Sequence, residues 1–357
     1  MQRETVSLVS ARPILDSRTD KAYVAANLAW LATQGIKLTN HFAVTHPSQP
    51  NYVAAVGGDY FGMDHNGFTM IDRNVSSIVD LLEAKGISWG EYQEDMPYSG
   101  FQGSGFRNPL TGANDYVRKH NPAIQYDSVA AHGRRLAQTK NLTLFARELA
   151  AGTLPQWLFI TPNMTSDGHD TSVTTAGAWT RAFLAPLLGD RRFMNRTLVL
   201  VTFDENATYA RQNRVLGLLL GDAVPAALRG TADAAFYNHY SEIASVAANW
   251  DLHTLGRWDV GANVWQFVAD QTGDKVRPWA GAVPLSQMYW NESYDGALYD
   301  EGESPFYPRP NLSTGRNGRS VLPEIARAWK GSNNPPFYED KIEVPDGRHP
   351  APGSGFR

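Results

Sequence analysis

Serine, acidic and histidine side chains in this chain gather where strand-like segments end. Ser48 lies in the turn 45–57, THPSQPNYVAAVG, between an apolar run at 36–44 and small residues at 52–56 that resemble the start of a helix. A serine at a helix start faces unpaired N–H groups and the positive end of the helix dipole, which suits a nucleophile for an anionic substrate. The same place also suits a serine that only caps the helix, and this segment alone favours the capping role.

Two adjacent carboxylates, Asp204 and Glu205, follow the strongest apolar run of the chain, TLVLVTF at 197–203. Neighbouring buried carboxylates repel each other and resist desolvation unless a cation lies between them. We therefore expect a divalent metal ion here. Oxygen ligands favour Mg, Ca or Mn, and nearby histidines would also admit Zn or Fe. An ion beside Ser48 would activate the hydroxyl and neutralise charge on a phosphoryl oxygen.

Histidines accompany these residues at two further strand ends. His169 lies between Asp167 and Asp170 in the segment that follows the apolar run 155–161, and His239 lies directly before the predicted helix 242–249. Each histidine could donate to phosphoryl oxygens, complete a second metal site or protonate a leaving group. Each could equally have only a packing or capping role.

Two loops supply weaker candidates. The segment 57–67 is rich in Gly, Asp, His and Asn, reads as a loop, and could bring His65 and Asn66 over Ser48. The long loop 93–121 contains Arg118, Lys119 and His120. Its basic side chains could contact an anionic substrate, although we interpret them as solvated surface charge.

Strand-like and helix-like segments alternate along the chain, which predicts a mostly parallel sheet with helices on both faces, an α/β/α sandwich. The predicted strands are 6–10, 36–44, 87–92, 155–161, 197–203 and 215–220. The predicted helices are 21–34, 75–85, 142–151, 179–188 and 242–249, with a further short helix within 258–268. Ligands of such sheets bind beyond the carboxyl ends of the strands. The clusters at Ser48, Asp167 and Asp204 should therefore converge at one edge.

The composition suggests one domain, residues 1–275, followed by a loop-rich extension. Residues 276–357 are rich in Pro, Gly, Ser and Asn and should wrap the domain, with a partly disordered end. A formal net charge of −4 gives no reason to expect a nucleic-acid partner. No apolar run approaches the roughly 20 residues that span a bilayer, so we expect no stable membrane anchor. The chain has no cysteine, which excludes disulfides and zinc–thiolate sites.

The number of glycosylation sequons suggests that the protein is secreted, whereas its N-terminal sequence does not resemble a signal peptide. Chance would give about three Asn-x-Ser/Thr sequons for this composition. The chain has seven, at Asn74, Asn141, Asn163, Asn195, Asn206, Asn291 and Asn311. The first twenty residues nevertheless contain no apolar segment of signal-peptide length. The two observations agree only if this N-terminus is truncated or mis-spliced.

Seven segments together resemble the fungal secreted acid phosphatases of the phosphoesterase family, in the alkaline-phosphatase-like superfamily. They are HPSQPNY, GGDYFG, WGEYQEDMP, YVRKHNP, ITPNMTSDGHDT, VTFDEN and FYNHYSE. The resemblance spans about residues 20 to 275. It implies an α/β/α sandwich that hydrolyses phosphate esters through a phosphoserine intermediate. The family also includes bacterial acid phosphatases and phospholipases C.

The resemblance also implies roles for single residues. Ser48 is similar to the nucleophile, Asn51 to a residue that shapes its turn and binds phosphate, and His169 to a catalytic histidine. Asp204 and Glu205 resemble the paired metal ligands. Weaker assignments are phosphate binding by His65, Asn66, His120 and His239, and metal binding by Asp167, Asp16 and the Ser48 oxygen.

One segment departs from the family pattern. The first strand of the family ends in Glu-Asn, which binds metal and phosphate, whereas this chain has Asp16 and Ser17 in the shifted context ILDSRTDKA. By analogy with outer-shell losses, a missing carboxylate could weaken metal binding by roughly 10- to 100-fold.

The sequence therefore predicts a metal-dependent acid phosphatase acting on a small phosphate ester, secreted or in the cell wall, with its oligomeric state open. The alternatives are a phospholipase C or phosphodiesterase, and an inactive glycosylated scaffold protein.

Overall fold

A computed structural model describes residues 4–10 as backbone and residues 25–281, 283–300, 306–313, 318–334, 337–342 and 344 in full. Eight strands form one sheet in the order β10-β2-β9-β8-β1-β7-β3-β6. Their bounds are β1 Glu4–Ser10, β2 Ile36–Phe42, β3 Trp89–Gln93, β6 Thr139–Asn141, β7 Trp157–Thr161, β8 Thr197–Phe203, β9 Gly217–Leu220 and β10 Ala232–Asn238. Neighbouring strands are parallel except where β9 pairs with β2 and β8.

Strand β8 shows why the sheet is covered on both faces. All seven of its residues are buried. Val199 and Val201 join one hydrophobic cluster, whereas Leu198 and Leu200 join another. Because successive side chains of a strand point to opposite faces, a continuous apolar run can supply both layers of core.

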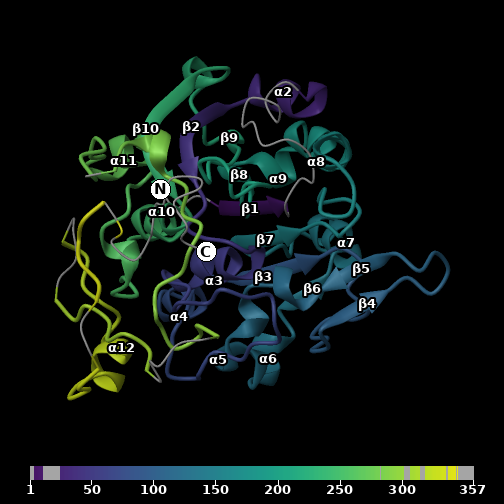
Figure 1. Cartoon of the computed structure of the whole chain (residues 1–357). Helices are drawn as coiled ribbons and strands as arrows, with labels where there is room; N and C mark the ends of the chain where they lie inside the picture. The colour runs from purple at the N-terminus through teal and green to yellow at the C-terminus, as the bar shows by residue number, and fades with distance from the viewer. Residues whose placement is uncertain are drawn as a thin grey trace.

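Helices pack on both faces of the sheet, which confirms the predicted α/β sandwich (Figure 1). Helices α2, α7, α8 and α9 share one hydrophobic cluster, and α3, α4, α10 and α11 contribute to the clusters on the other side. The helix bounds are α2 Ala26–Ala32, α3 Ser48–Gly57, α4 Ile78–Ala84, α5 Asp127–Ala130, α6 Gly133–Leu136, α7 Thr143–Ala151, α8 Val173–Leu188, α9 Arg191–Met194, α10 Tyr240–Trp250, α11 Gln266–Thr272 and α12 Pro323–Ala328.

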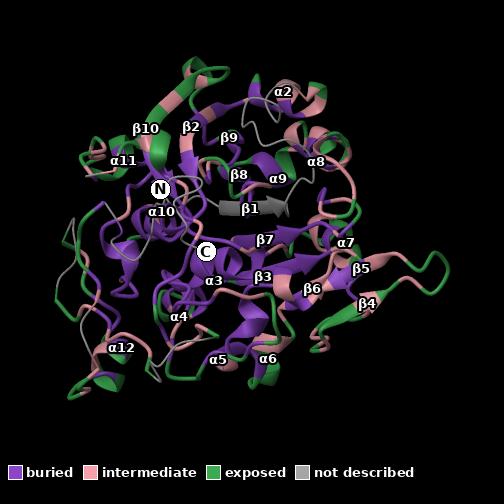
Figure 2. Cartoon of the chain, viewed as in Figure 1, coloured by how far each residue is buried: buried purple, intermediate pink, exposed green. Residues whose placement is uncertain are grey.

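Several elements were not expected from the sequence. The loop predicted at 93–121 contains a hairpin of β4 Gly105–Arg107 and β5 Asn114–Val117, with an exposed connection (Figure 2). Strands β6 and β10 and the short helix α12 were also missed. Strand β10 pairs with β2 and brings residue 239 to the same edge as the end of β2.

The C-terminal extension takes part in the core. Trp290, Tyr294 and Tyr338 belong to the same hydrophobic cluster as α3 and α4. The buried Asp59 carboxylate accepts hydrogen bonds from the Tyr294 hydroxyl at 2.6 Å and the Tyr338 hydroxyl at 2.5 Å. The division of the chain near residue 275 stays a prediction. In the part of the chain that is described, no helix has the length and apolar character needed to cross a membrane.

Candidate active site

The turn that carries Ser48 is held by one amide side chain. Asn51 Oδ1 accepts hydrogen bonds from the backbone N–H of Val44 at 2.9 Å and of Thr45 at 3.3 Å. Its Nδ2 donates to the carbonyls of Thr45 at 2.9 Å and Pro47 at 3.0 Å. These contacts use the donors and acceptors of the amide. Asn51 therefore shapes the turn, and the geometry gives no support to its predicted contact with phosphate.

Ser48 is the first residue of α3, and its hydroxyl does not cap the helix. Pro47 is the N-cap, without a capping side chain. The Ser48 hydroxyl instead donates to Glu205 Oε1 at 3.0 Å, and it lies close enough to the Asp204 carboxylate to favour its ionised form. The nucleophile candidate thus links a helix N-terminus to Glu205 and lies beside Asp204, at the carboxyl edge of the sheet.

His46 was not among the residues predicted for the site. Its Nδ1 is hydrogen-bonded to Glu205 Oε2, and both side chains are buried. The ring stacks on Tyr209 with centroids 4.1 Å apart. Glu205 therefore bridges Ser48 through one carboxylate oxygen and His46 through the other. The only sequence signal was the position of His46 two residues before Ser48.

Asp204 is a buried carboxylate with one oxygen that receives no hydrogen bond. Its Oδ1 accepts the Glu205 N–H at 2.8 Å, while no hydrogen bond reaches Oδ2. Burial, with a further contribution from the Glu205 charge, raises the pKa of Asp204 to about 7. A cation would relieve this cost, because an opposite charge favours the ionised carboxylate.

A second cluster, from the loops after β5 and β7, lies next to these acids. Asp167 Oδ2 is 3.4 Å from His120 Nδ1, His169 Nδ1 is 2.8 Å from Asp170 Oδ1, and His169 Nε2 is 3.3 Å from Lys119 Nζ. Burial, with a smaller contribution from the Asp204 charge, raises the pKa of Asp167 well above its usual range. Burial lowers the pKa of Lys119, and the nearby carboxylates oppose that shift.

Lys119 and Tyr52 are the other residues whose roles were missed. Lys119 is half-buried and lies within electrostatic reach of Asp204, Glu205 and Asp167, so it is not a solvated surface charge. Tyr52 is buried and stacks on His120 with ring centroids 4.9 Å apart. Burial, and then the charges of the same three acids, raise the pKa of Tyr52 well above its usual range.

The loop candidates lie in different surroundings. His65 Nε2 is 3.4 Å from Asp300 Oδ1, and Nδ1 accepts the Gly67 N–H at 3.0 Å, so this ring belongs to a partly exposed cluster with Asp64. Asn66 Oδ1 accepts the N–H of Gln49, the residue after Ser48, at 3.0 Å. Asn66 is therefore beside the nucleophile turn, whereas His65 has no hydrogen bond or ion pair with Asp204 or Glu205 in the described part of the chain.

His239 contacts the acidic centre only through the main chain. Its Nε2 is 2.7 Å from the Asp204 carbonyl oxygen, and its Nδ1 is 3.1 Å from Glu242 Oε1. Both nitrogens are thus engaged, which gives no support to the predicted phosphate contact. Asp16, the remaining predicted ligand, and Ser17 lie outside the described residues.

A cleft of about 190 Å³ adjoins the nucleophile turn and the lysine. Its lining includes Gln49, Asn66, Phe68, Ser104, Arg118 and Lys119. Phe68 is 59% exposed, and the Arg118 guanidinium carbon lies 4.6 Å from its ring centroid. The cleft places an aromatic face and a cationic wall beside the turn that holds Ser48.

The donor set around Ser48 fits a divalent cation. Asp204 Oδ2 has no hydrogen bond, and the Glu205 carboxylate and the Ser48 hydroxyl lie beside it. Hard cations such as Mg²⁺ prefer such oxygen ligands. Among the described residues, neither group with three His or acidic ligand atoms within 4.8 Å contains Asp204 or Glu205. Asp204 and Glu205 therefore lack a third histidine or acidic ligand among these groups. An ion bound to them would also need the Ser48 oxygen or another kind of ligand.

Comparisons with known proteins identify the family of the chain. Residues 22–253 match the model of the Phosphoesterase family. An acid phosphatase of Aspergillus fumigatus is 54% identical over 323 residues, covering 89% of this chain and 71% of the relative. A phosphate-repressible acid phosphatase of Penicillium chrysogenum is 52% identical over 328 residues, covering 91% of this chain and 77% of the relative.

A solved structure from a study of glycosaminoglycan metabolism by Bacteroides thetaiotaomicron shares the fold. It has a TM-score of 0.50 at 10% identity and covers 78% of this chain and 79% of that structure. The family match covers more than half of the chain. The similarity to the fungal relatives covers more residues than this match and continues past residue 253. On these grounds, the chain belongs to the Phosphoesterase family.

Proposed function

We propose that the protein is a metal-dependent acid phosphatase that hydrolyses phosphate monoesters through a phosphoserine at Ser48. The observation that carries the proposal is the Ser48 hydroxyl, placed at the N-terminus of α3 and donating to Glu205 Oε1 at 3.0 Å. Relatives that are 46–54% identical and named as acid phosphatases or a probable one support the substrate class.

In the first step, the Ser48 oxygen attacks phosphorus in line with the leaving alcohol. Glu205 Oε1 accepts the serine proton, because it already accepts the hydroxyl hydrogen bond. His46 holds the other carboxylate oxygen and fixes the orientation of Glu205. The bond between phosphorus and the alcohol oxygen breaks, which leaves phosphoserine and an alkoxide that needs a proton.

Lys119 and His169 serve the phosphoryl oxygens and the leaving group. Lys119 supplies positive charge beside the acids, which would otherwise repel a phosphate dianion. His169 is oriented by Asp170 at 2.8 Å and can give a proton to the departing alcohol. In the second step, water attacks the phosphoserine, His169 takes the water proton, and Glu205 returns the first proton to Ser48.

The residues that would hold a divalent ion are Asp204, Glu205 and the Ser48 oxygen. When bound, such an ion would lower the pKa of the serine hydroxyl and neutralise charge on the phosphoryl group. The orphaned Asp204 Oδ2 supports this assignment. Mg, Ca, Mn, Zn and Fe remain the candidates.

Two other functions from the sequence analysis stay open to test. Diester hydrolysis by a phosphodiesterase or phospholipase C requires room for a second ester group. That group could lie in the cleft that Arg118 and Lys119 line. An inactive scaffold would follow if the loss of Glu-Asn at residues 16 and 17 prevents metal binding.

The proposal is tested by hydrolysis of p-nitrophenyl phosphate at pH 5, with and without a chelator, in wild type and Ser48→Ala. We expect chelator-sensitive activity in wild type and its loss in Ser48→Ala. Ser77→Ala is the matched control, because it also removes a buried serine hydroxyl at a helix start. Retained activity in Ser48→Ala would remove the nucleophile, and a folded but inactive wild type would favour the scaffold. Faster cleavage of bis-p-nitrophenyl phosphate than of the monoester would favour the diesterase.

We further propose a secreted or cell-wall location. Asn74 and Asn195 are exposed sequon asparagines, which supports glycosylation at these two sites. Asn206 is buried and its Nδ2 donates to Gln212 O at 2.8 Å, so we expect no glycan there. A small phosphate ester as the partner, without nucleic acid, remains the expectation.

A further inference from the structure

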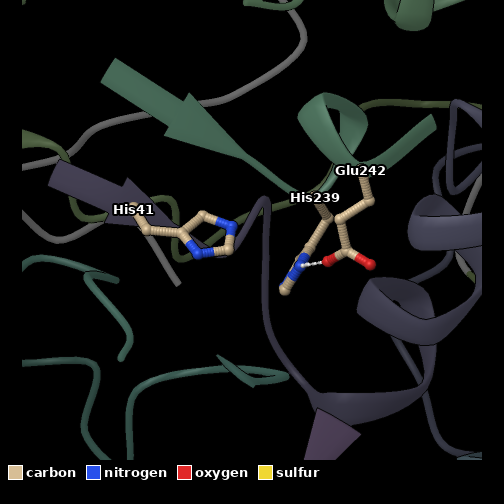
Figure 3. A group of neighbouring side chains, drawn as sticks. All are labelled: His41, His239 and Glu242. Carbon is tan, nitrogen blue, oxygen red and sulfur yellow. Dashed lines mark hydrogen bonds and ion pairs between the residues drawn. The ribbon is translucent and has the colours of Figure 1, made fainter. Parts of the chain in front are cut away.

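Three ligand-type side chains lie together behind the candidate active site. His41 comes from β2, and His239 and Glu242 come from the start of α10. Their nitrogen and carboxylate atoms all lie within 4.8 Å of one another, and the residues are 0%, 1% and 3% exposed. Figure 3 shows the His41 ring extending toward the facing pair of His239 and Glu242. None of the three has a part in the proposed phosphatase chemistry.

The contacts of His239 leave a nitrogen lone pair directed at a carboxylate. Its Nε2 faces the Asp204 carbonyl oxygen at 2.7 Å, and a carbonyl can only accept, so Nε2 carries a proton. In the neutral ring, Nδ1 is then an acceptor, and it lies 3.1 Å from Glu242 Oε1, which is also an acceptor when ionised. Two buried acceptors at this distance need a positive charge with them, either a proton or a metal ion.

His41 favours the metal ion. Its ring is fully buried and lies against the Asn238 backbone, which favours a proton on the ring, yet neither Nδ1 nor Nε2 makes a hydrogen bond of good geometry. A proton shared between His239 and Glu242 would leave these nitrogens unsatisfied, at the usual desolvation cost.

We propose that His41, His239 and Glu242 bind a second, buried metal ion of the zinc class, with one coordination position left for a further ligand. Two imidazoles and one carboxylate are a donor set that zinc accepts at about 2.0–2.2 Å per ligand. Ligands at that length around a tetrahedral ion lie roughly 3.3–3.6 Å apart, so atoms that now lie up to 4.8 Å apart would have to approach each other by up to about 1.5 Å. The His-x-x-Glu spacing puts two ligands on one face of the first turn of α10.

The ion would also tie this centre to the catalytic acids. A metal-bound His239 keeps its Nε2–H on the carbonyl oxygen of Asp204, as histidine ligands commonly do with a second partner. The site would then fix the main chain from which the Asp204 and Glu205 side chains project. This proposal does not depend on the phosphatase function, because its ligands and its readout are separate from Ser48.

The test measures zinc that resists a chelator. The full chain is produced with zinc in the medium, dialysed against EDTA, and analysed for metal by mass spectrometry. We expect one zinc per chain in wild type, because the buried ligands exchange slowly. The same content is expected in Glu205→Gln, which alters the catalytic acids, and in His132→Asn, which alters an exposed histidine as the matched control. Glu242→Gln and His41→Asn should each lose this ion.

Two results would overturn the proposal: a folded wild type without EDTA-resistant metal, or undiminished zinc in Glu242→Gln. Should the variants fail to fold, X-ray absorption of the zinc in EDTA-dialysed wild type still decides. Two imidazoles in its ligand shell support the site, and a shell of oxygens alone contradicts it.

Discussion

Glu91 should make the protein more stable in acid than at neutral pH. It lies in the middle of β3 with 0% exposure, and its Oε1 accepts the Ala123 N–H at 2.9 Å. Its Oε2 has no partner. Burial raises the pKa of Glu91 from its usual 4.5 to about 8. The folded state therefore holds this proton over a pH range in which the unfolded chain has released it.

The sign and size of the effect follow from linkage. Where the folded state binds more protons, the free energy of unfolding falls as pH rises, here between pH 4.5 and about 8. At about 1.4 kcal/mol per pKa unit, the full loss is on the order of 5 kcal/mol. Substitution Glu91→Gln keeps the acceptor for the Ala123 N–H and removes the titration. The variant should thus match wild type near pH 4.5 and exceed its stability by several kcal/mol at pH 8.

The assay is urea unfolding followed by tryptophan fluorescence across this pH range. The difference in stability between Glu91→Gln and wild type reports the titration of Glu91 alone. Other buried acids with a raised pKa, such as Asp204, are present in both proteins and cancel. Glu324→Gln, an exposed change on α12, is the control and should show no such pH-dependent difference. A stability difference between Glu91→Gln and wild type that is equal at pH 5 and pH 8 would refute the reasoning.

Three further substitutions probe the site and the C-terminal anchor. His46→Asn removes the partner of Glu205 and should lower kcat by about 10- to 100-fold; unchanged steady-state kinetics would contradict its role. Lys119→Met removes a positive charge from the phosphate site and should reduce kcat/KM by about tenfold or more, with the larger loss at low salt. An unchanged kcat/KM would show that Lys119 has no role in binding phosphate. Tyr338→Phe removes a hydrogen bond to the buried Asp59 carboxylate and should lower the free energy of unfolding by about 1–3 kcal/mol, and an unchanged urea midpoint would argue against this anchor.

The parts of the fold that could be predicted are those with a strong local signal. The runs 155–161 and 197–203 are nearly continuously apolar because both faces of the sheet are covered, and they contain β7 and β8. Strand β10 was missed because its sequence, ADAAFYN, is alanine-rich and only its last three residues are buried. Strand β6 has three residues, too few for any periodicity. The leucines of β9 indicate burial and carry no information about strand direction.

Some residues of the candidate site could likewise be predicted from the sequence, and others could not. Ser48, Asp204 and Glu205 could be brought together from the sequence because each follows a strand that ends at the same edge of the sheet. His46 and Lys119 acquire their roles from partners far away in the chain. Glu205 is 159 residues from His46, and Lys119 is set among acids from two other loops. Such contacts leave no local pattern, so a charge among polar neighbours was interpreted as solvated.

The central claim is that Ser48 carries the phosphoryl group during turnover. The most direct measurement is to quench the enzyme in acid during hydrolysis of p-nitrophenyl phosphate and to map phosphate on its peptides by mass spectrometry. The account predicts one phosphorylated residue, Ser48, whose occupancy appears with substrate and is absent in Ser48→Ala. Turnover with phosphate on another side chain, or full activity without any phosphoenzyme in Ser48→Ala, would contradict it.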